Sequence, residues 1–226
     1  NGRIKQSDIQ RGDWLVSINS GVISKRLDVS IRLLPEAPFA LKHLAPIKFY
    51  IGAKRISAKL AIIESKNHAL LPNEECLAQI ILDKPASAIV GDRFLIRDHS
   101  ESFIMGGGTV LDPNGPQFGK SRIGRLDWLK AMQLSSHKAS INYLLDRNKV
   151  FDFDQFCLIR NCPNNSNCSL LPIGSKTFRR GGRLWVANTS TWGTISAWLE
   201  EFIREWHRRH PECPGIKERE LEKTIA

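Results

Sequence analysis

FIMGGGTVLDP, residues 103–113, places three consecutive glycines inside an otherwise apolar run. Consecutive glycines can cradle a phosphate, or they can let a strand bend or pass close to another backbone. A phosphate-binding loop of the dinucleotide type requires the spacing GxGxxG with a helix directly behind it. This stretch lacks that spacing, and TVLDP continues as a strand. The sequence therefore favours a glycine-bearing strand within a β-sheet.

Short apolar runs of strand length surround this stretch, from residue 12 to about residue 112. Turn signals separate the runs, several of which alternate apolar with polar residues, and the prolines fall between them. Six or seven such runs predict an antiparallel β-barrel or a sandwich. The runs are DWLVSI (13–18), RLDVSIRLL (26–34), IKFYIG (47–52), ISAKLAIIE (56–64), CLAQIILD (76–83), RFLIRD (93–98) and GGTVLD (107–112).

The pattern becomes helical after residues 112–125, DPNGPQFGKSRIGR, whose proline and glycine content is typical of a linker. Two helices are predicted by apolar residues at helical spacing, and a third, shorter one by Asp152 as its N-cap. KTFRRGGRLWVAN, residues 176–188, predicts a hairpin with Gly181 and Gly182 at its turn. These parts predict a winged-helix domain. The helical repeats are Leu126, Leu129 and Met132, then Ile141, Leu144 and Leu145.

A long amphipathic helix is predicted from residue 194, because apolar residues recur there at i, i+3, i+4 and i+7. The stripe consists of Ile195, Trp198, Leu199, Phe202, Ile203 and Trp206.

The formal net charge of the 226-residue chain is +10, and it divides unevenly. Residues 1–117 hold 15 basic and 12 acidic residues, net +3, and residues 118–226 hold 18 and 11, net +7. Such an excess favours a polyanionic partner, most commonly nucleic acid, with solubility as the alternative reason. The basic clusters are Lys54 with Arg55, Arg93 with Arg97, Arg179, Arg180 and Arg183 around the hairpin turn, and Arg208 with Arg209.

Motifs for catalysis and cofactor binding are incomplete in this chain. GPQFGKS, residues 115–121, nearly matches a nucleotide-binding P-loop, but Gly115 is one residue too close to Gly119. No Ser, His and Asp grouping indicates nucleophilic catalysis. We therefore expect no catalytic residue and no cofactor in this chain.

The cysteines raise the alternative of a metal or thiol enzyme. Cys157, Cys162 and Cys168 are separated by four and five residues, whereas zinc knuckles usually have two between their ligands. Five cysteines without an export signal indicate reduced thiols. We expect no metal site. No apolar window of about 18 residues occurs, so we expect no membrane association and a cytoplasmic location.

Four motifs occur in an order that resembles the selenocysteine-specific elongation factor family (SelB), relatives of EF-Tu with winged-helix domains appended. The motifs are RGDWLV (11–16), GDRFLIRD (91–98), GGGTVLDP (106–113) and RLDWL (125–129). The resemblance covers nearly the whole chain and is strongest at residues 88–113. It implies a multi-domain β and α+β chain, in which an EF-Tu domain-3-like antiparallel β-barrel precedes a winged-helix domain.

The resemblance also implies domain bounds. It places the end of a second barrel at residues 1–20 and the third-domain barrel at residues 25–115. A winged helix follows at residues 118–189, and residues 190–226 hold a long helix and the start of a second winged-helix domain.

The function implied by the resemblance is delivery of selenocysteinyl-tRNA to the ribosome at recoded UGA codons. This segment would contribute tRNA binding and a connector to winged helices that grip the selenocysteine insertion hairpin of the mRNA. The family's GTPase domain, which binds GTP and Mg²⁺, has no counterpart in the sequence. We therefore expect a non-enzymatic segment of a GTPase.

Candidate tRNA contacts follow from the family's third domain, in which the glycine-rich segment ends the barrel beside the T-stem of the tRNA. By resemblance, a surface near tRNA holds Arg97, His99, Ser100 and the segment of Gly106, Gly107 and Gly108, whose role is geometric. Lys54, Arg55 and Arg93 are further candidates for phosphate contact. Many relatives carry a Thr where this chain has Ile104, and a His near the strand FYIG, so polar roles at those positions do not carry over.

A winged-helix regulator is the main alternative. In it, Arg179, Arg180 and Arg183 would form a nucleic-acid-binding wing, and the helix at residues 136–146 would bind DNA. This alternative predicts that residues 118–226 bind a duplex without the barrel.

Overall fold

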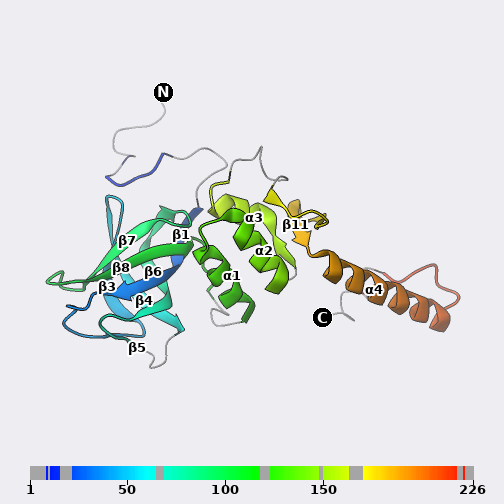
Figure 1. Ribbon diagram of the computed structural model, residues 1–226, viewed down its shortest axis with the longest axis horizontal. Coiled ribbons are helices and arrows are strands. Elements are labelled where there is room, and N and C mark those ends of the chain that lie inside the picture. Colours follow the sequence, from blue (N-terminus) through cyan, green and yellow to red (C-terminus); the bar gives the residue numbers. More distant parts are fainter. Residues whose placement is uncertain are drawn as a thin grey trace.

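The computed structural model describes residues 9, 11–15, 22–64, 69–117, 123–147, 150–162, 170–217 and 221. A β-barrel, a helical unit with a small sheet and a long helix follow one another along an elongated molecule (Figure 1). Most of residues 1–20, predicted to end a second barrel, lie outside the described residues. The strand predicted at residues 13–18 is not seen in its described part, because residues 13–15 have no regular structure.

Six strands close into an antiparallel barrel in the order β1-β6-β4-β3-β7-β8, which confirms the barrel and excludes the sandwich. Alternate apolar side chains of these strands fill the interior, among them Phe49, Ile31 and Met105. Two short strands, β2 (Leu41–Lys42) and β5 (Ala69–Leu70), pair separately. The barrel strands are β1 (Val22–Leu33), β3 (Ala45–Ile51), β4 (Lys54–Glu64), β6 (Glu75–Ala88), β7 (Arg93–Asp98) and β8 (Ile104–Asp112).

The three glycines lie in β8, which closes the barrel between β1 and β7. A Cβ added at Gly106 or Gly108 would lie 2.9 Å from a Cα of β1. One added at Gly107 would lie 2.5 Å from the Phe94 carbonyl oxygen of β7. Since backbone atoms at these distances cannot yield to a side chain, the glycines allow β8 to approach both neighbours. The choice of a strand over a phosphate loop is confirmed.

The sequence predicted that the prolines lie between strands, but two of them lie within strands. Pro46 is part of β3 and is in register with Lys59 of β4. Pro85 is part of β6, in the stretch between Ile81 and Ala86 where the register with β1 shifts. An irregular position of this kind tolerates a residue that lacks a backbone N–H.

The helical unit combines three helices with a three-stranded sheet of order β10-β11-β9, the arrangement of a winged-helix fold. Asp152 caps α3 as predicted, because its carboxylate accepts the backbone N–H of Gln155 at 2.9 Å. Gly181 and Gly182 form the hairpin turn with φ of 58° and 77°. The third strand was not predicted. The elements are α1 (Ile123–Gln133), α2 (His137–Arg147), β9 (Val150–Asp152), α3 (Phe153–Ile159), β10 (Lys176–Arg180) and β11 (Arg183–Ala187).

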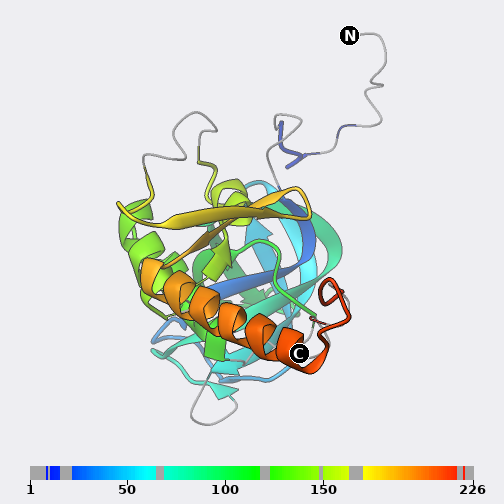
Figure 2. The same cartoon turned by 90° about the vertical axis from the view of Figure 1, so that its right-hand side faces the viewer.

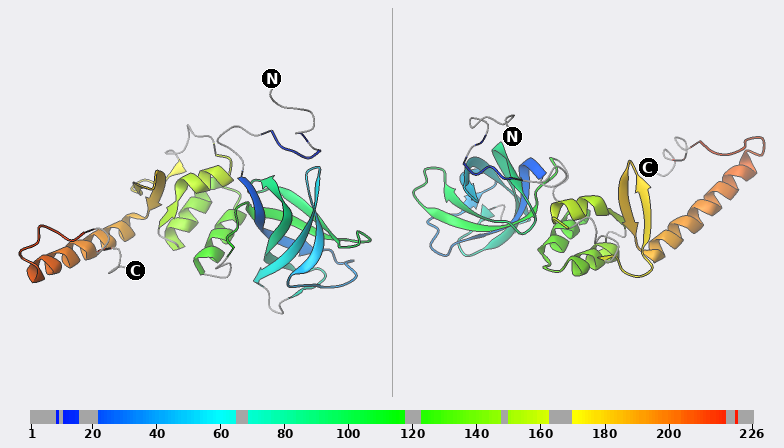
Figure 3. Two further views of the ribbon diagram at one scale, coloured as in Figure 1. Left: turned by 180° about the vertical axis from the view of Figure 1, so that it is seen from behind. Right: turned by 90° about the horizontal axis from the view of Figure 1, so that it is seen from above.

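The long helix is α4 (Thr189–Arg209), which projects from the hairpin away from the barrel (Figure 3). Asn188 begins it by accepting the backbone N–H of Ser190 at 2.8 Å. No residue of α4 is buried in the structure. Figure 2 looks along the molecule with α4 in front and the barrel behind. In the described part of the chain, no helix is both long and apolar enough to span a membrane.

The barrel and the helical unit share one apolar cluster. Leu77 of β6 and Leu111 of β8 are buried against α1, where they join Trp128 and Leu129. The backbone N–H of Val90 on the barrel also donates to the carbonyl of Ile159 at the end of α3, at 2.9 Å. The two units therefore share a hydrophobic core and are not joined by the connecting segment alone.

A buried charged network crosses the same joint. The Arg125 guanidinium of α1 donates to Asp28 of β1 at 2.9 Å and to Asp112 of β8 at 2.7 Å. Trp128 Nε1 donates to Asp112 at 3.0 Å, and Gln79 Nε2 donates to Asp28 at 2.7 Å. Both carboxylates are fully buried, and burial raises the pKa of Asp28 although Arg125 opposes the shift. Such a satisfied network fixes one orientation, because any slip would leave a buried charge unpaired.

Candidate nucleic-acid interface

The outer surface of β3, β4 and β7 collects basic side chains at the alternate positions that point away from the core. Lys48 of β3 is in register with Ser57 of β4 on one side and with Arg97 of β7 on the other. Arg55 lies one row further along, in register with Tyr50. Exposed lysines of β4 and β6 extend the surface. We call it the basic face, made up of Lys48, Arg55, Lys59, Lys84 and Arg97.

A hollow lies within the basic face. It is lined by Lys48, Arg55, Ile56, Ser57, Asp83 and Lys84. Lys48 Nζ donates to the Ser57 hydroxyl at 2.8 Å, which holds the ammonium group beside Ser57 in the hollow. Three cationic side chains against one carboxylate favour an anionic ligand such as a phosphate.

A hydrogen-bonded cluster holds Arg55 in place. The Tyr50 hydroxyl donates to Glu101 at 2.7 Å, and Arg55 forms an ion pair with the same carboxylate. The hydrogen bond from Tyr50 lowers the pKa of Glu101, and the charges of Arg55 and Lys48 lower it further. Arg55 keeps more than half of its side chain exposed. It can therefore contact a ligand, whereas Arg97 is half-buried.

The loop between β7 and β8 is organised by Asp98. Its carboxylate accepts the backbone N–H of Phe103 at 2.6 Å and of Ser100 at 3.1 Å, and also the Ser100 hydroxyl. These hydrogen bonds, with that of the Ser100 hydroxyl first, lower the pKa of Asp98. His99 and Ser100 are exposed on this loop, next to Arg97. The structure thus brings these three candidates together at the end of β7.

The glycines contribute geometry to this surface and few contacts. Gly106 is buried between β1 and β7, and Gly108 is in register with the core residues Phe94 and Ile31. Gly107 is in register with the exposed Leu95. Only Gly107 therefore faces outward. A ligand beside β8 would contact the side chains of neighbouring residues, because the glycines have none.

Two of the candidate cations lie apart from the basic face. Lys54 forms an ion pair with Asp13 at 3.0 Å, beside Gly12, so the N-terminal segment covers and neutralises it. Arg93 is exposed at the start of β7, where it is in register with Thr109 of β8. It lies two rows beyond Arg97, outside the hollow.

Sequence reasoning missed Lys48, Lys59 and Lys84, which lie on three different strands. A local signal existed, because Lys48 and Lys59 occupy polar positions of alternating strands. The hairpin of β3 and β4 brings Lys48 next to the strand of Arg55, and only the barrel order brings Lys84 there.

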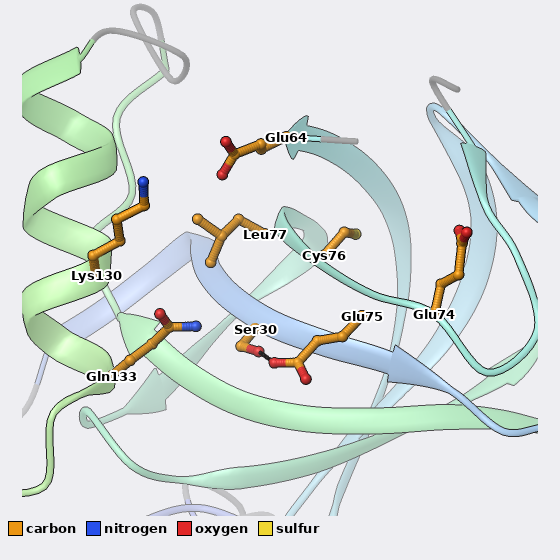
Figure 4. Close-up of a pocket in the computed structure, with 8 residues that line it drawn as sticks. All are labelled: Ser30, Glu64, Glu74, Glu75, Cys76, Leu77, Lys130 and Gln133. Carbon is orange, nitrogen blue, oxygen red and sulfur yellow. Dashed lines mark hydrogen bonds between the residues drawn. The ribbon is translucent and has the colours of Figure 1, made fainter. Parts of the chain in front are cut away.

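A second hollow, between the barrel and α1, is acidic (Figure 4). Glu75 accepts the Ser30 hydroxyl there, and burial, with Glu74 and Glu75 nearby, raises the pKa of the Cys76 thiol to about 12. Both hollows include residues of β4 and β6, but at different ends of these strands: Arg55 and Lys84 line the basic hollow, whereas Glu64 and Glu75 line the acidic one. A polyanion is therefore favoured at one end of these strands and repelled at the other. The acidic hollow is lined by Ser30, Glu64, Glu74, Glu75, Cys76, Leu77, Lys130 and Gln133.

The hairpin of β10 and β11 carries the three arginines predicted to form a wing. Arg183 forms an ion pair with Asp152 at 2.9 Å, and the Arg179 guanidinium donates to the Gly182 carbonyl at 3.3 Å. The Phe178 and Trp185 rings stack beside them, 6.5 Å apart. The wing is exposed, but Asp152 offsets one of its charges.

The cysteines of the metal alternative are only partly described. Within the described ranges, no group of three or more His, Cys, Asp or Glu residues is arranged to hold a metal ion. Cys168 lies outside those ranges, as do residues 118–121 of the P-loop-like stretch.

Residues 25–117 match a family model described as the β-barrel domain of the selenocysteine-specific elongation factor. The chain is 31% identical over 137 residues to the selenocysteine-specific elongation factor of Haemophilus influenzae, covering 61% of this chain and 21% of that protein. It is 28% identical over 232 residues to that of Desulfomicrobium baculatum, covering 96% and 35%.

A solved structure shares the fold. The crystal structure of the bacterial selenocysteine-specific elongation factor EF-Sec superposes with a TM-score of 0.61 at 15% identity, covering 97% of this chain and 33% of that one. The chain thus spans about a fifth to a third of the length of these proteins. Residues 25–117 thus match the β-barrel domain of the selenocysteine-specific elongation factor family, and the chain is similar to members of that family over nearly all of its length.

Proposed function

We propose that this chain is part of a selenocysteine-specific translation elongation factor that delivers selenocysteinyl-tRNA to the ribosome at recoded UGA codons. In this proposal the barrel binds the tRNA. The helical unit and α4 connect it to segments that bind the selenocysteine insertion hairpin of the mRNA. The observation that carries the proposal is the basic face, which lies wholly within the segment that matches the family's barrel.

Binding would occur between the basic face and the phosphates of the acceptor and T-stem. Lys48, Arg55 and Lys84 converge on one hollow, where a phosphate can accept from two or three of them at once. Backbone contacts of this kind fix the position of a duplex but do not read its bases. Their affinity falls with salt, because each neutralised phosphate releases counterions.

The joint between the barrel and the helical unit would set the reach toward the mRNA. Since Arg125 ties α1 to two barrel strands, the helical unit keeps its orientation relative to a bound tRNA. GTP and Mg²⁺ would be bound by a GTPase domain outside this chain, and the segment itself would be a binding module without catalysis.

The test is binding of the 226-residue chain to selenocysteinyl-tRNA, with another elongator aminoacyl-tRNA and a DNA duplex as controls, over a salt series. We expect selenocysteinyl-tRNA to bind most tightly, with log K falling linearly with log salt at a slope of about −0.9 per phosphate contacted. Equal or tighter binding of the duplex would overturn the proposal.

A winged-helix regulator is the second candidate, favoured by the exposed Arg179 beside the stacked Phe178 and Trp185. It differs in where the ligand binds. Duplex affinity would then depend on the wing and would be unaffected by changes on the barrel.

A further inference from the structure

The carboxyl end of α3 brings two cysteine side chains into contact. Asn161 adopts a left-handed conformation with φ of 50°, and its N–H donates to the Leu158 carbonyl at 3.2 Å. The N–H of Cys162 donates to the Cys157 carbonyl at 2.9 Å. These two hydrogen bonds define a Schellman motif. In this motif, the side chain of the residue after the left-handed one commonly packs against the side chain three positions before the C-cap residue. Here both partners are cysteines, and both side chains are buried in the same apolar cluster.

Two basic side chains surround the pair. The His137 ring nitrogens lie 3.8 and 3.9 Å from Cys162 Sγ. The Arg160 guanidinium donates to the Leu134 carbonyl at 2.8 Å and to the Met132 carbonyl at 3.0 Å, so it is fixed at the end of α1. Burial, together with the charge of Arg160, lowers the pKa of His137, which favours a neutral imidazole able to accept a proton.

The two thiols differ in acidity. The hydrogen bond from Cys157 lowers the pKa of the Cys162 thiol against the effect of burial, and Arg160 lowers it further. The hydrogen bond to Cys162 raises the pKa of the Cys157 thiol, and burial raises it further. Of the two thiols, Cys162 is therefore the one that more readily forms the thiolate, which is the form that attacks a disulfide.

We propose that Cys157 and Cys162 are a redox modification site, at which a small-molecule disulfide of the glutathione type oxidises the two thiols to an intramolecular disulfide. The Schellman geometry places these side chains in contact before any reaction, as a disulfide requires of its two cysteines. Both are 5–7% exposed, so the reaction proceeds from opening of the last turn of α3.

The reaction balances as two exchanges. The Cys162 thiolate attacks one sulfur of glutathione disulfide, the S–S bond breaks, and one glutathione leaves as a thiolate that takes up a proton. Cys157 then loses its proton to water as the last turn of α3 opens, and its thiolate attacks the Cys162 sulfur of the mixed disulfide. The second glutathione then leaves and is protonated. Two protein thiols are oxidised, and one glutathione disulfide is reduced to two thiols.

The disulfide would fasten the joint between the helical unit and the barrel. Ile159, whose carbonyl accepts the Val90 N–H, lies between the two cysteines in the sequence, and so does Arg160, which binds the end of α1. Locking this turn suppresses its opening. We therefore expect slower amide exchange at Val90 and Cys162 in the oxidised chain.

The test equilibrates the whole chain with defined ratios of reduced to oxidised glutathione, followed by acid quenching, alkylation and peptide mapping by mass spectrometry. We expect Cys157 and Cys162 to lose alkylation together, with a direct cross-link between them, at ratios that leave Cys76 and Cys213 alkylated. The competing explanation is that the two thiols only supply the apolar contact of the motif. Independent alkylation of the two cysteines at every ratio, or separate glutathione adducts on both, would overturn the proposal.

Two single variants identify the attacking thiol. In Cys157→Ser, removal of the second thiol should trap glutathione on Cys162 as a stable mixed disulfide. In Cys162→Ser, the thiol of higher pKa remains, and we expect several-fold less adduct on Cys157. Equal adduct in both variants would contradict the assignment of Cys162. If either variant does not fold, the cross-link in the unmodified chain still decides the proposal.

Discussion

The helical unit meets its two neighbours in different ways. Toward the barrel it shares an apolar cluster and the fully buried carboxylates of Asp28 and Asp112, which Arg125 pairs. Toward α4 its contacts are lighter, such as the Phe178 and Trp192 rings 5.7 Å apart, and no residue of α4 is buried. The comparison shows that the barrel and the helical unit share one core, whereas the stripe of α4 contributes no buried residue within the described chain.

The largest effect is expected at the buried network. Arg125→Met leaves two buried carboxylates without a cation, so we expect a loss of about 3–5 kcal/mol in the free energy of unfolding. Denaturant titration measures it. Lys130→Met, at an exposed position of the same helix, is the matched control and should change the value by no more than about 0.5 kcal/mol. A similar small change in both variants would show that the joint is not fastened by these charges.

The glycines give the next largest contrast. Gly108→Ala forces a Cβ against the Ser30 and Ile31 backbone, and we expect about 1–3 kcal/mol of destabilisation. A Cβ added at Gly193 in α4 would have no neighbouring atom within 4 Å, so Gly193→Ala should stabilise that helix by roughly 1 kcal/mol or less. Thermal unfolding monitored by circular dichroism tests the pair. Neutral behaviour of Gly108→Ala would refute the close approach of β8 to β1.

A smaller effect on the free energy of unfolding is expected from changes in the apolar stripe of α4. Trp198 is 48% exposed, so Trp198→Ala should change the free energy of unfolding of this chain by at most about 0.5 kcal/mol. Trp128→Ala, in the shared cluster at 9% exposure, should cost about 3–5 kcal/mol. The two variants are compared in one denaturant series, and an equal cost would mean that α4 is packed in solution.

The smallest effect concerns pH at the end of α4. Hydrogen bonds from Arg208 and then Arg209 lower the pKa of Glu205 from 4.5 to about 2. A lowered carboxyl pKa stabilises the folded helix above the ordinary value, and this stabilisation is lost as pH falls from 4.5 toward 2. We expect α4 amide exchange, corrected for its intrinsic pH dependence, to increase across this range. Glu205→Gln should remove the dependence, and its persistence in that variant would assign it elsewhere.

The strands and helices could largely be predicted because their signals are local. Alternation over six to nine residues predicted β7 and β8, and apolar spacing with Asp152 predicted α3. The joint could not be predicted, since Arg125 and Asp28 are 97 residues apart and the sequence around neither residue indicates its partner. The linker expected around residue 115 in fact leads into a shared core.

The candidate site was predicted in part for the same reason. Arg55, Arg97 and the loop with His99 were found from clusters and from family resemblance. The ion pair of Lys54 with Asp13 was not predicted, because nothing in the sequence around either residue indicates the contact. Lys48 was missed although the hairpin of β3 and β4 is local, and Lys84 was missed because β6 becomes a neighbour of β4 only when the barrel forms. The contact of Cys157 with Cys162 depends on the left-handed Asn161, which spacing alone did not reveal.

The central claim is that tRNA binds the barrel and not the wing, and two double variants test it directly. The affinity for selenocysteinyl-tRNA is measured over a salt series for Lys48→Ala/Lys84→Ala on the basic face and for Arg179→Ala/Arg180→Ala on the wing. We predict that the barrel pair weakens binding and makes the salt slope shallower by about 2, since two phosphate contacts are lost, while the wing pair changes neither. Weakened binding in the wing pair, with an unchanged barrel pair, would contradict the assignment of the tRNA surface to the barrel.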